Sequence, residues 1–424
     1  MVQKILEGKG SADQVALATA PHAALDAAVA RGLKRCAIEA AVAYETTCVT
    51  GPVAPAGAHA ARAAFLSHGL VVARAGAGFP APVHLERFAS PARLCLVDDP
   101  RFASLGGIGM LALASSAADL GATLAGHPID VAKPRSVHVL LTGKTRPFVC
   151  ARDVALELVR RGLGDVVARA RGEHGAPIVV EFGGASVRLL SVGERAVLAG
   201  VAPHVGAAAA LFPSDERTEV FLRDQRRSKA HRALAPDPGA PFDEVMQIDL
   251  GAVDPLALDG GKVRAVRELG GKAVSQVVLG GDGGVTLRDL LATALLLKSK
   301  RVPPDVELLF APPSRQMLET LAAEGALFDL VATGARIVEP DARISSGELY
   351  PPPSSGVALQ SFDLGANAKG PVVASPETLA YAAATGTLGD PRGFKRPVRV
   401  SVPRTLPTDD VLVARGSSRA RNGT

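Results

Sequence analysis

The stretch that best predicts the architecture is Val277-Val278-Leu279-Gly280-Gly281-Asp282-Gly283-Gly284, an apolar run that ends in a glycine-rich loop. The helical pattern Thr286-Leu287-Arg288-Asp289-Leu290 follows directly. A buried strand that turns through glycines into a helix is typical of a parallel α/β sheet. Backbone N–H groups at the start of such a helix can receive an anion, so Gly280, Gly281, Gly283 and Gly284 are candidate ligand-binding residues. Asp282 places a carboxylate in the loop, which works against an anion.

Strand and helix patterns alternate on both sides of this loop, which predicts an α/β fold. We expect strands over residues 273–279, 306–310 and 330–333, and helices over 287–298 and 316–324. A polar, proline-rich passage marks a boundary near residues 233–241. The predicted organisation is an N-terminal α/β domain (1–133), a second α/β domain (134–232), a linker (233–247), a third α/β domain (248–392) and a C-terminal tail (393–424).

Composition narrows the class of protein. The 424 residues are 47% hydrophobic and carry a net charge of +5, with basic residues dispersed along the chain. The densest basic run, residues 223–232, has no aromatic residues for base stacking and predicts a solvated helix face, which argues against nucleic acid. No apolar run approaches the ~20 residues that span a bilayer. The four cysteines lack Cys-x-x-Cys spacing and are expected to be core thiols, so we expect a cytoplasmic protein without membrane attachment.

Further runs extend the pattern in a fixed order along the chain. The most specific run is Gly206-Ala207 followed by Leu211-Phe212-Pro213-Ser214-Asp215-Glu216-Arg217-Thr218. Other runs are Leu141-Thr142-Gly143-Lys144, Ala151-Arg152-Asp153-Val154, Ala374-Ser375-Pro376-Glu377-Thr378 and Gly386-Thr387-Leu388-Gly389-Asp390-Pro391-Arg392. Together with the 277–284 loop, they resemble the aconitase and 3-isopropylmalate dehydratase large-subunit family over roughly residues 139–392. The resemblance implies three α/β/α domains around a central cleft, without the family's mobile small-subunit (swivel) domain.

The resemblance also implies where an iron–sulfur cluster would be held. Three cysteines hold a [4Fe–4S] cluster in the family, and their positions correspond here to Asp282, Ala342 and Ser345. Clusters of this type require thiolate ligands, and the methyl group of Ala342 has no lone pair. No remaining cysteine lies near these loops in sequence. We therefore expect a degenerate family member without the cluster, without another cofactor and without a metal.

The family's acid–base and substrate-binding groups are replaced as well. Asp99 is retained, whereas Arg101 stands in place of a histidine and His204 in place of an active-site glutamate. With Asp282 they form a candidate catalytic set, since carboxylate, imidazole and guanidinium groups can perform acid–base work without metal. The alternative is that these charges pair with one another as a structural plug. Residues 360–369, which correspond to the family's carboxylate clamp, contain no arginine.

Three functions follow from this pattern. The first is a cluster-free pseudoenzyme that acts as a scaffold, regulatory subunit or binder of a small carboxylate or other anion, with Ser345 and the loop glycines as candidate ligand contacts. The second is a metal-independent lyase or isomerase that acts on a carboxylated metabolite through Asp99, Arg101, His204 and Asp282. The third is an RNA-binding aconitase-like protein. The resemblance also implies a small-subunit-like swivel-domain protein as a possible partner.

Overall fold

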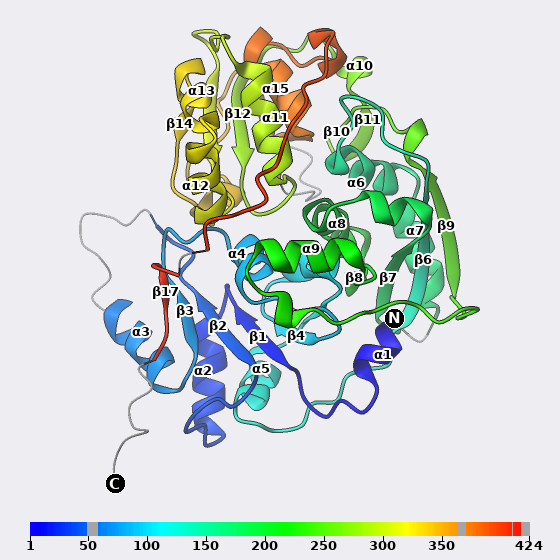
Figure 1. The fold of residues 1–424 in the computed structure, drawn as a ribbon, viewed down its shortest axis with the longest axis vertical. Helices are drawn as coiled ribbons and strands as arrows, with labels where there is room; N and C mark the ends of the chain where they lie inside the picture. Colours follow the sequence, from blue (N-terminus) through cyan, green and yellow to red (C-terminus); the bar gives the residue numbers. More distant parts are fainter. Residues whose placement is uncertain (49–57, 174, 363–369, 409, 417–424) are drawn as a thin grey trace.

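The computed structural model describes residues 1–48, 58–173, 175–362, 370–408 and 410–416. These residues form three β-sheets of six, four and seven strands, each accompanied by helices (Figure 1). The predicted α/β fold class is therefore confirmed. No helix of the described residues is both long and apolar enough to cross a bilayer.

The first unit is a six-stranded sheet with the order β17-β3-β2-β1-β4-β5. Its strands are β1 (Gln14–Leu17), β2 (Ala40–Tyr44), β3 (Val71–Ala73), β4 (Leu94–Val97), β5 (Leu111–Ala114) and β17 (Val413–Ala414). Its helices are α1 (Val2–Leu6), α2 (Pro21–Ala30), α3 (Ala58–Ser67), α4 (Pro80–Arg87), η1 (Pro100–Ile108) and α5 (Ala117–Leu124). Strands β1 to β5 pair in parallel, whereas β17 runs antiparallel to β3. Residues 413–414, expected in the C-terminal tail, thus form an edge strand of the first sheet (Figure 1).

The second unit is a four-stranded parallel sheet with the order β8-β7-β6-β9. Its strands are β6 (Arg135–Thr142), β7 (Ile178–Gly183), β8 (Ala209–Leu211) and β9 (Glu244–Asp249). Its helices are α6 (Ala151–Arg160), α7 (Leu163–Arg171), η2 (Ala185–Leu189), α8 (Val192–Ala199), η3 (Ala202–Val205), α9 (Glu216–Asp224), η4 (Ser228–Ala230) and η5 (Leu250–Ala252). Residues 244–247, expected in the linker, lie in β9. This strand is at the sheet edge and alternates exposed and covered residues, which gives it the polar sequence of a linker.

The third unit is a seven-stranded sheet with the order β11-β10-β16-β15-β12-β13-β14. Its strands are β10 (Leu256–Asp259), β11 (Lys262–Ala265), β12 (Val274–Gly280), β13 (Glu307–Ala311), β14 (Arg336–Ile337), β15 (Val357–Gln360) and β16 (Val372–Ala374). Its helices are α10 (Val266–Leu269), α11 (Leu287–Leu297), α12 (Arg315–Ala323), α13 (Ala326–Thr333), α14 (Arg343–Ser346), α15 (Pro376–Thr385) and η6 (Pro391–Phe394). Strands β12 to β16 pair in parallel, and β10 pairs antiparallel with β11 and β16.

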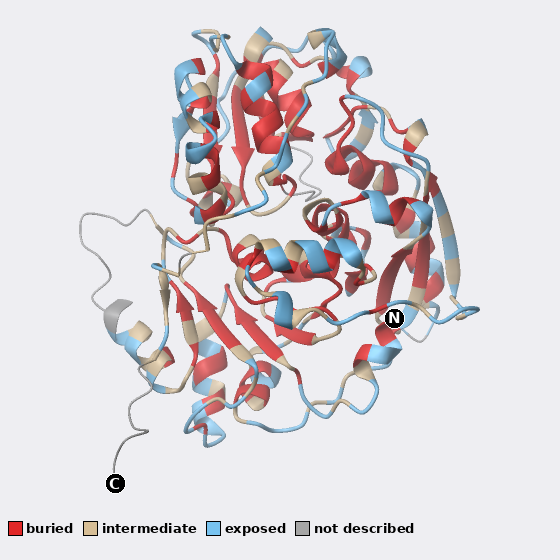
Figure 2. Cartoon of the chain, viewed as in Figure 1, coloured by how far each residue is buried: buried red, intermediate tan, exposed pale blue. Residues whose placement is uncertain are grey.

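The prediction of a strand at residues 330–333 is wrong, because these residues end helix α13. Leu330 is buried while Phe328 and Val331 are exposed, so the apolar run reflects a helix with one buried side and not a buried strand. The other strands and helices predicted around the glycine loop occur within two residues of their expected ends. Figure 2 shows that the central strands of each sheet are buried, as expected for parallel sheets covered by helices.

The basic run at residues 223–232 is also less solvated than predicted. The guanidinium of Arg227 donates hydrogen bonds to the carbonyl oxygens of Glu86 at 3.1 Å and Ala89 at 2.6 Å. It therefore satisfies carbonyl groups at and beyond the C-terminal end of α4, where a cation also complements the helix dipole. At least this member of the basic run has a structural role.

Candidate functional site

A small cavity of about 70 Å³ lies where segments of all three units meet. Its polar and charged lining consists of Arg101, Ser104, Arg152, His204, Asp282 and Ser345. Three of the four candidate catalytic residues thus line one cavity. The fourth, Asp99, is held beside it by Arg101.

Arg101 connects two buried carboxylates. Its Nη1 lies 3.2 Å from Oδ2 of Asp282, and its Nε donates to Oδ2 of Asp99 at 2.9 Å. The side chains of Asp99 and Asp282 are only 5% and 3% exposed, whereas that of Arg101 is 36% exposed. Asp99 also accepts a hydrogen bond from the Arg101 backbone N–H at 2.9 Å, as the N-cap of η1. The geometry therefore supports ion pairing of these charges, with the Arg101 head at the cavity wall.

The glycine-rich loop is built for close approach of the backbone. Gly280 and Gly284 have φ angles of +104° and +82°, which favour glycine. A Cβ on Gly280 would lie 1.9 Å from the Ala311 carbonyl oxygen, and one on Gly284 would lie 1.8 Å from an Arg152 nitrogen. The loop thus brings β12 against β13 and seats the Arg152 guanidinium.

The prediction that the loop offers its backbone N–H groups to an anion is not supported for three glycines. The N–H groups of Gly280, Gly281 and Gly283 donate to Ser361 Oγ, the Ala311 carbonyl and the Gly281 carbonyl, at 3.0, 2.8 and 3.1 Å. A backbone N–H group has a single hydrogen to donate, unlike a guanidinium with five, so these three groups are already used within the protein. Any anion in this cavity is therefore recognised mainly by side chains, with Gly283 and Gly284 as parts of the wall.

Arg152 is a site residue for which the sequence pattern predicts no role. It is 95% buried, since its relative exposure is 5%, and it lines the cavity beside Gly284. A signal for Arg152 is present in the sequence at the start of α6. The arginine lies in the Ala151-Arg152-Asp153 run, and the residues of this part of the helix are buried. A second guanidinium matters chemically because this group meets a carboxylate with two parallel hydrogen bonds.

The loop that holds the other two cluster-ligand positions reaches the same region. Ser345 lines the cavity, and Ala342 is the N-cap of the short helix α14. Cys48, which is distant in sequence, packs against this loop: its N–H donates to Asp341 Oδ2 at 2.8 Å and its thiol to the Pro340 carbonyl at 3.3 Å. Burial raises the pKa of this thiol to about 11, so it is protonated at neutral pH.

These residues do not fit a [4Fe–4S] cluster. The positions that require thiolates present a carboxylate paired with Arg101, a methyl group and a hydroxyl group. Cys48 is one protonated thiol near this loop, while Cys150 belongs to a separate buried group with Asp289 and Glu377. Residues 363–369, which include most of the segment matched to the carboxylate clamp, lie outside the described residues.

A larger and mainly apolar cavity of about 290 Å³ adjoins the small one. The two share part of their walls, including Ser104, Ala196, Val197, Gly283 and Gly284. Most of the rest of the larger wall comes from helices α4, α8, α9, α11 and α12 and from residues 402–406. The arrangement combines a charged end around Arg101 and Arg152 with an apolar chamber.

The chain is similar to known proteins across most of its length. Residues 58–263 match the sequence pattern of the aconitase family (aconitate hydratase). The 3-isopropylmalate dehydratase large subunit 1 of Thermotoga maritima is 28% identical over 342 residues, which are 77% of this chain and 79% of that protein. The corresponding large subunit of Elusimicrobium minutum is 26% identical over 341 residues, 76% of this chain and 78% of its own. The homoaconitase large subunit of Thermus thermophilus is 31% identical over 279 residues, 64% and 63% of the two chains.

Proposed function

Because the chain belongs to the aconitase family, we propose that it is a cluster-free relative of the dehydratase large subunits that binds a small carboxylate in place of catalysing its dehydration. The observation that carries the proposal is the pairing of two arginines, Arg101 and Arg152, on a cavity whose cluster-ligand positions are an aspartate and a serine. Guanidinium groups recognise carboxylates, and this recognition does not need iron.

The small cavity favours binding over hydro-lyase chemistry. Its charged side chains are already held in place by their neighbours. Arg101 joins Asp99 to Asp282, and Arg152 packs against Gly284. Such preorganised charges bind a ligand at little cost in reorganisation. A carboxylate can contact the cavity-facing part of Arg101, and its hydrocarbon part can extend into the adjoining apolar chamber.

A metal-independent lyase or isomerase is the second candidate, and one observation favours it. His204 and Asp282 line the same cavity, so an imidazole and a carboxylate face a common space. An imidazole is the side chain best suited to exchange protons near neutral pH. A lyase or isomerase would have to convert its ligand into a product, whereas the first candidate function requires only that the ligand binds.

The proposal includes a partner. The relatives are named as large subunits, and a large subunit works with a smaller one. We therefore propose that a small-subunit-like protein covers the cleft of this chain. Co-purification with the product of an adjacent small-subunit gene checks this part independently of ligand binding.

Binding is tested by titrating the purified chain with citrate and with 3-isopropylmalate in a calorimeter. We expect binding of at least one of them, and weakening by roughly 10- to 100-fold in Arg101→Met and Arg152→Met, because each loses a charge-assisted contact worth about 1.5–3 kcal/mol. Arg301→Met, which changes an exposed arginine, is the matched control. The proposal is contradicted if neither citrate nor 3-isopropylmalate binds. It is also contradicted if the unaltered chain and the three variants bind with equal affinity. Release of a dehydrated or isomerised product would favour the second candidate.

A further inference from the structure

Three helices begin at one buried point between the second and third units. Cys150 is the N-cap of α6, Asp289 lies in the first turn of α11, and Glu377 lies in the first turn of α15. The sulfur of Cys150 and one carboxylate oxygen from each acid lie within 4.8 Å of one another, and all three residues are buried. We infer that this group is a binding site for a divalent transition-metal ion of the Zn²⁺ type, separate from the cavity around Arg101.

Glu377 supplies an observation independent of the clustering. It is only 7% exposed, yet its Oε2 is buried and has no hydrogen-bond partner among the described residues. A buried carboxylate oxygen without a partner is costly, and a cation is one of the few groups that offsets the cost. Desolvation raises the pKa of both Asp289 and Glu377 to about 7, so without a cation these groups retain protons near neutral pH.

The neighbouring hydrogen bonds fix the ligands in place. The Thr286 N–H donates to Asp289 Oδ2 at 2.9 Å, and the Cys150 N–H donates to Asp153 Oδ2 at 3.0 Å. The other oxygen of Asp153 accepts from the Leu256 N–H at 2.9 Å, which anchors this corner to β10. Hydrogen bonds of this kind orient the ligands of metal sites.

The donor set selects the class of ion. A thiolate with two carboxylates suits a borderline ion such as Zn²⁺, while Mg²⁺ and Ca²⁺ prefer oxygen donors alone. Zn–S and Zn–O distances of ~2.3 and ~2.0–2.2 Å place the ligand atoms of a tetrahedral site ~3.4–3.6 Å apart. This spacing falls inside the 4.8 Å limit within which the three ligand atoms lie here. A polar cavity of about 480 Å³ has Glu377 in its wall and provides an entry path.

An ion at this point would join the second unit to the third. Cys150 comes from α6, whereas Asp289 and Glu377 come from helices of the seven-stranded unit. Because an ion that binds only the folded state stabilises it, zinc should raise the unfolding temperature of the whole chain.

The test uses the full chain after treatment with a chelator, with Zn²⁺ alone as the probe in competition with a chromophoric indicator. We expect one Zn²⁺ per chain and a higher unfolding temperature, and with Co²⁺ a thiolate-to-metal absorption band. Cys150→Ser should abolish this band, and both Cys150→Ser and Glu377→Gln should weaken zinc binding by at least ~10-fold. Cys95→Ser, which removes a buried thiol in β4, is the matched control and should bind like the unaltered chain.

The inference is overturned if the unaltered chain binds no zinc. It is also overturned if Cys150→Ser and Glu377→Gln both bind as tightly as the Cys95→Ser control. Glu377→Gln guards against a folding artefact, because removing a buried carboxyl without a full set of partners should leave the metal-free protein folded and at least as stable as before.

Discussion

One guanidinium, that of Arg101, pairs with the nearly buried carboxylates of both Asp99 and Asp282. Losing Arg101 should therefore affect stability more than losing either acid. If Asp282 is changed, the Arg101 guanidinium still pairs with Asp99, and part of its surface remains exposed to solvent. If Arg101 is changed, two carboxylates lose their shared cation while they remain buried. An uncompensated buried charge costs far more than a lost ion pair at a partly exposed position.

We therefore predict an asymmetry in stability. Arg101→Met should lower the free energy of unfolding by roughly 3–5 kcal/mol, the range typical of a broken buried pair, and Asp282→Asn by only about 1 kcal/mol. Denaturant unfolding of the two variants at neutral pH measures the difference, with Arg301→Met as the exposed control. Equal costs would mean that Arg101 is not the common partner of the two acids.

At the same scale, the sequence identified some site residues and missed others. The family pattern led to Arg101, His204 and Asp282, which line one cavity, because each stands at a position where the family places a functional group. Arg152 and Cys48 were missed as site residues, since their places depend on how segments distant in sequence pack together. The bridge from Arg101 to Asp282 likewise depends on side-chain conformation, which no residue pattern encodes.

At the scale of a structural element, the loop at residues 280–284 shows why glycine is required at some of its positions. Four loop glycines have positive φ angles, but they differ in their surroundings. The Cβ position of Gly280 is 1.9 Å from a backbone oxygen of β13, whereas that of Gly283 has no atom within 4 Å. One glycine is required by strand packing and the other only by its backbone angle.

This contrast gives a prediction with an internal control. Gly280→Ala should separate β12 from β13 and either prevent folding or cost well over ~3 kcal/mol, because backbone atoms cannot move aside cheaply. Gly283→Ala should cost only ~1–2 kcal/mol, the strain of a left-handed alanine. Thermal unfolding of both variants compares them, and similar midpoints would rule out this account of the loop.

Elements were predictable where periodicity and caps agree. The apolar helical pattern predicts helix α11, and the structure adds a capping box at its start, where both hydrogen bonds between Thr286 and Asp289 are present. The apolar run at the end of helix α13 predicts a strand because it is short, and a short apolar run does not distinguish a strand from a helix. The first four residues of strand β9 read as a linker because half of an edge strand faces solvent.

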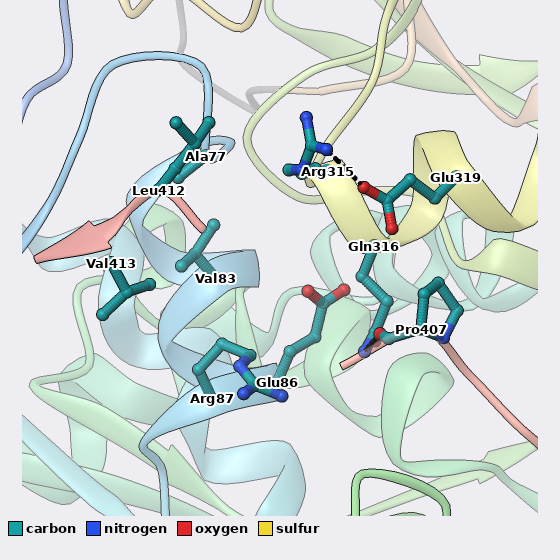
Figure 3. A pocket seen from close by; sticks show the side chains of 10 residues that line it. All are labelled: Ala77, Val83, Glu86, Arg87, Arg315, Gln316, Glu319, Pro407, Leu412 and Val413. Carbon is teal, nitrogen blue, oxygen red and sulfur yellow. Dashed lines mark hydrogen bonds and ion pairs between the residues drawn. The ribbon is translucent and has the colours of Figure 1, made fainter. Parts of the chain in front are cut away.

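At the scale of the whole molecule, the C-terminal segment contacts both the first and the third unit. Gln316 of α12 donates to the Pro407 carbonyl, and Arg87 of α4 pairs with Asp410. The side chain of Glu86 lies between those of Arg87 and Gln316 (Figure 3). It accepts a hydrogen bond from Ser314 Oγ at 2.8 Å. Burial raises the pKa of Glu86 to about 7, so this junction between the first and third units contains a carboxyl group that resists ionisation.

The junction should therefore make stability depend on pH. Glu86 is protonated in the folded chain but ionised in the unfolded chain between its usual pKa of 4.5 and about 7, so the folded state binds more protons there. The free energy of unfolding should fall as pH rises through this window and level off above it. Glu86→Gln should make the fall shallower and raise stability at pH ~8, and the remaining slope should come from groups such as Asp289 and Glu377, whose pKa values burial also raises. Glu324→Gln, at an exposed position, should change neither the slope nor the stability. A pH profile unchanged by Glu86→Gln would remove Glu86 as the cause.

Binding of an iron–sulfur cluster would depend on the arrangement of all three units. The ligand positions lie on two separate loops of the third unit, and these loops face the other two units at the small cavity. The chain offers aspartate, alanine and serine at these positions, so after anaerobic reconstitution with iron and sulfide we expect no stoichiometric cluster and no turnover of citrate or 3-isopropylmalate. Asp282→Cys alone should not help, because two thiolates would still be missing and Arg101 would lose a partner. The checks are bound iron per chain and the visible absorbance of the purified protein. A full cluster in the unaltered chain would show that Cys48 or another group completes a site by rearrangement, and the proposal of a cluster-free protein would then fail.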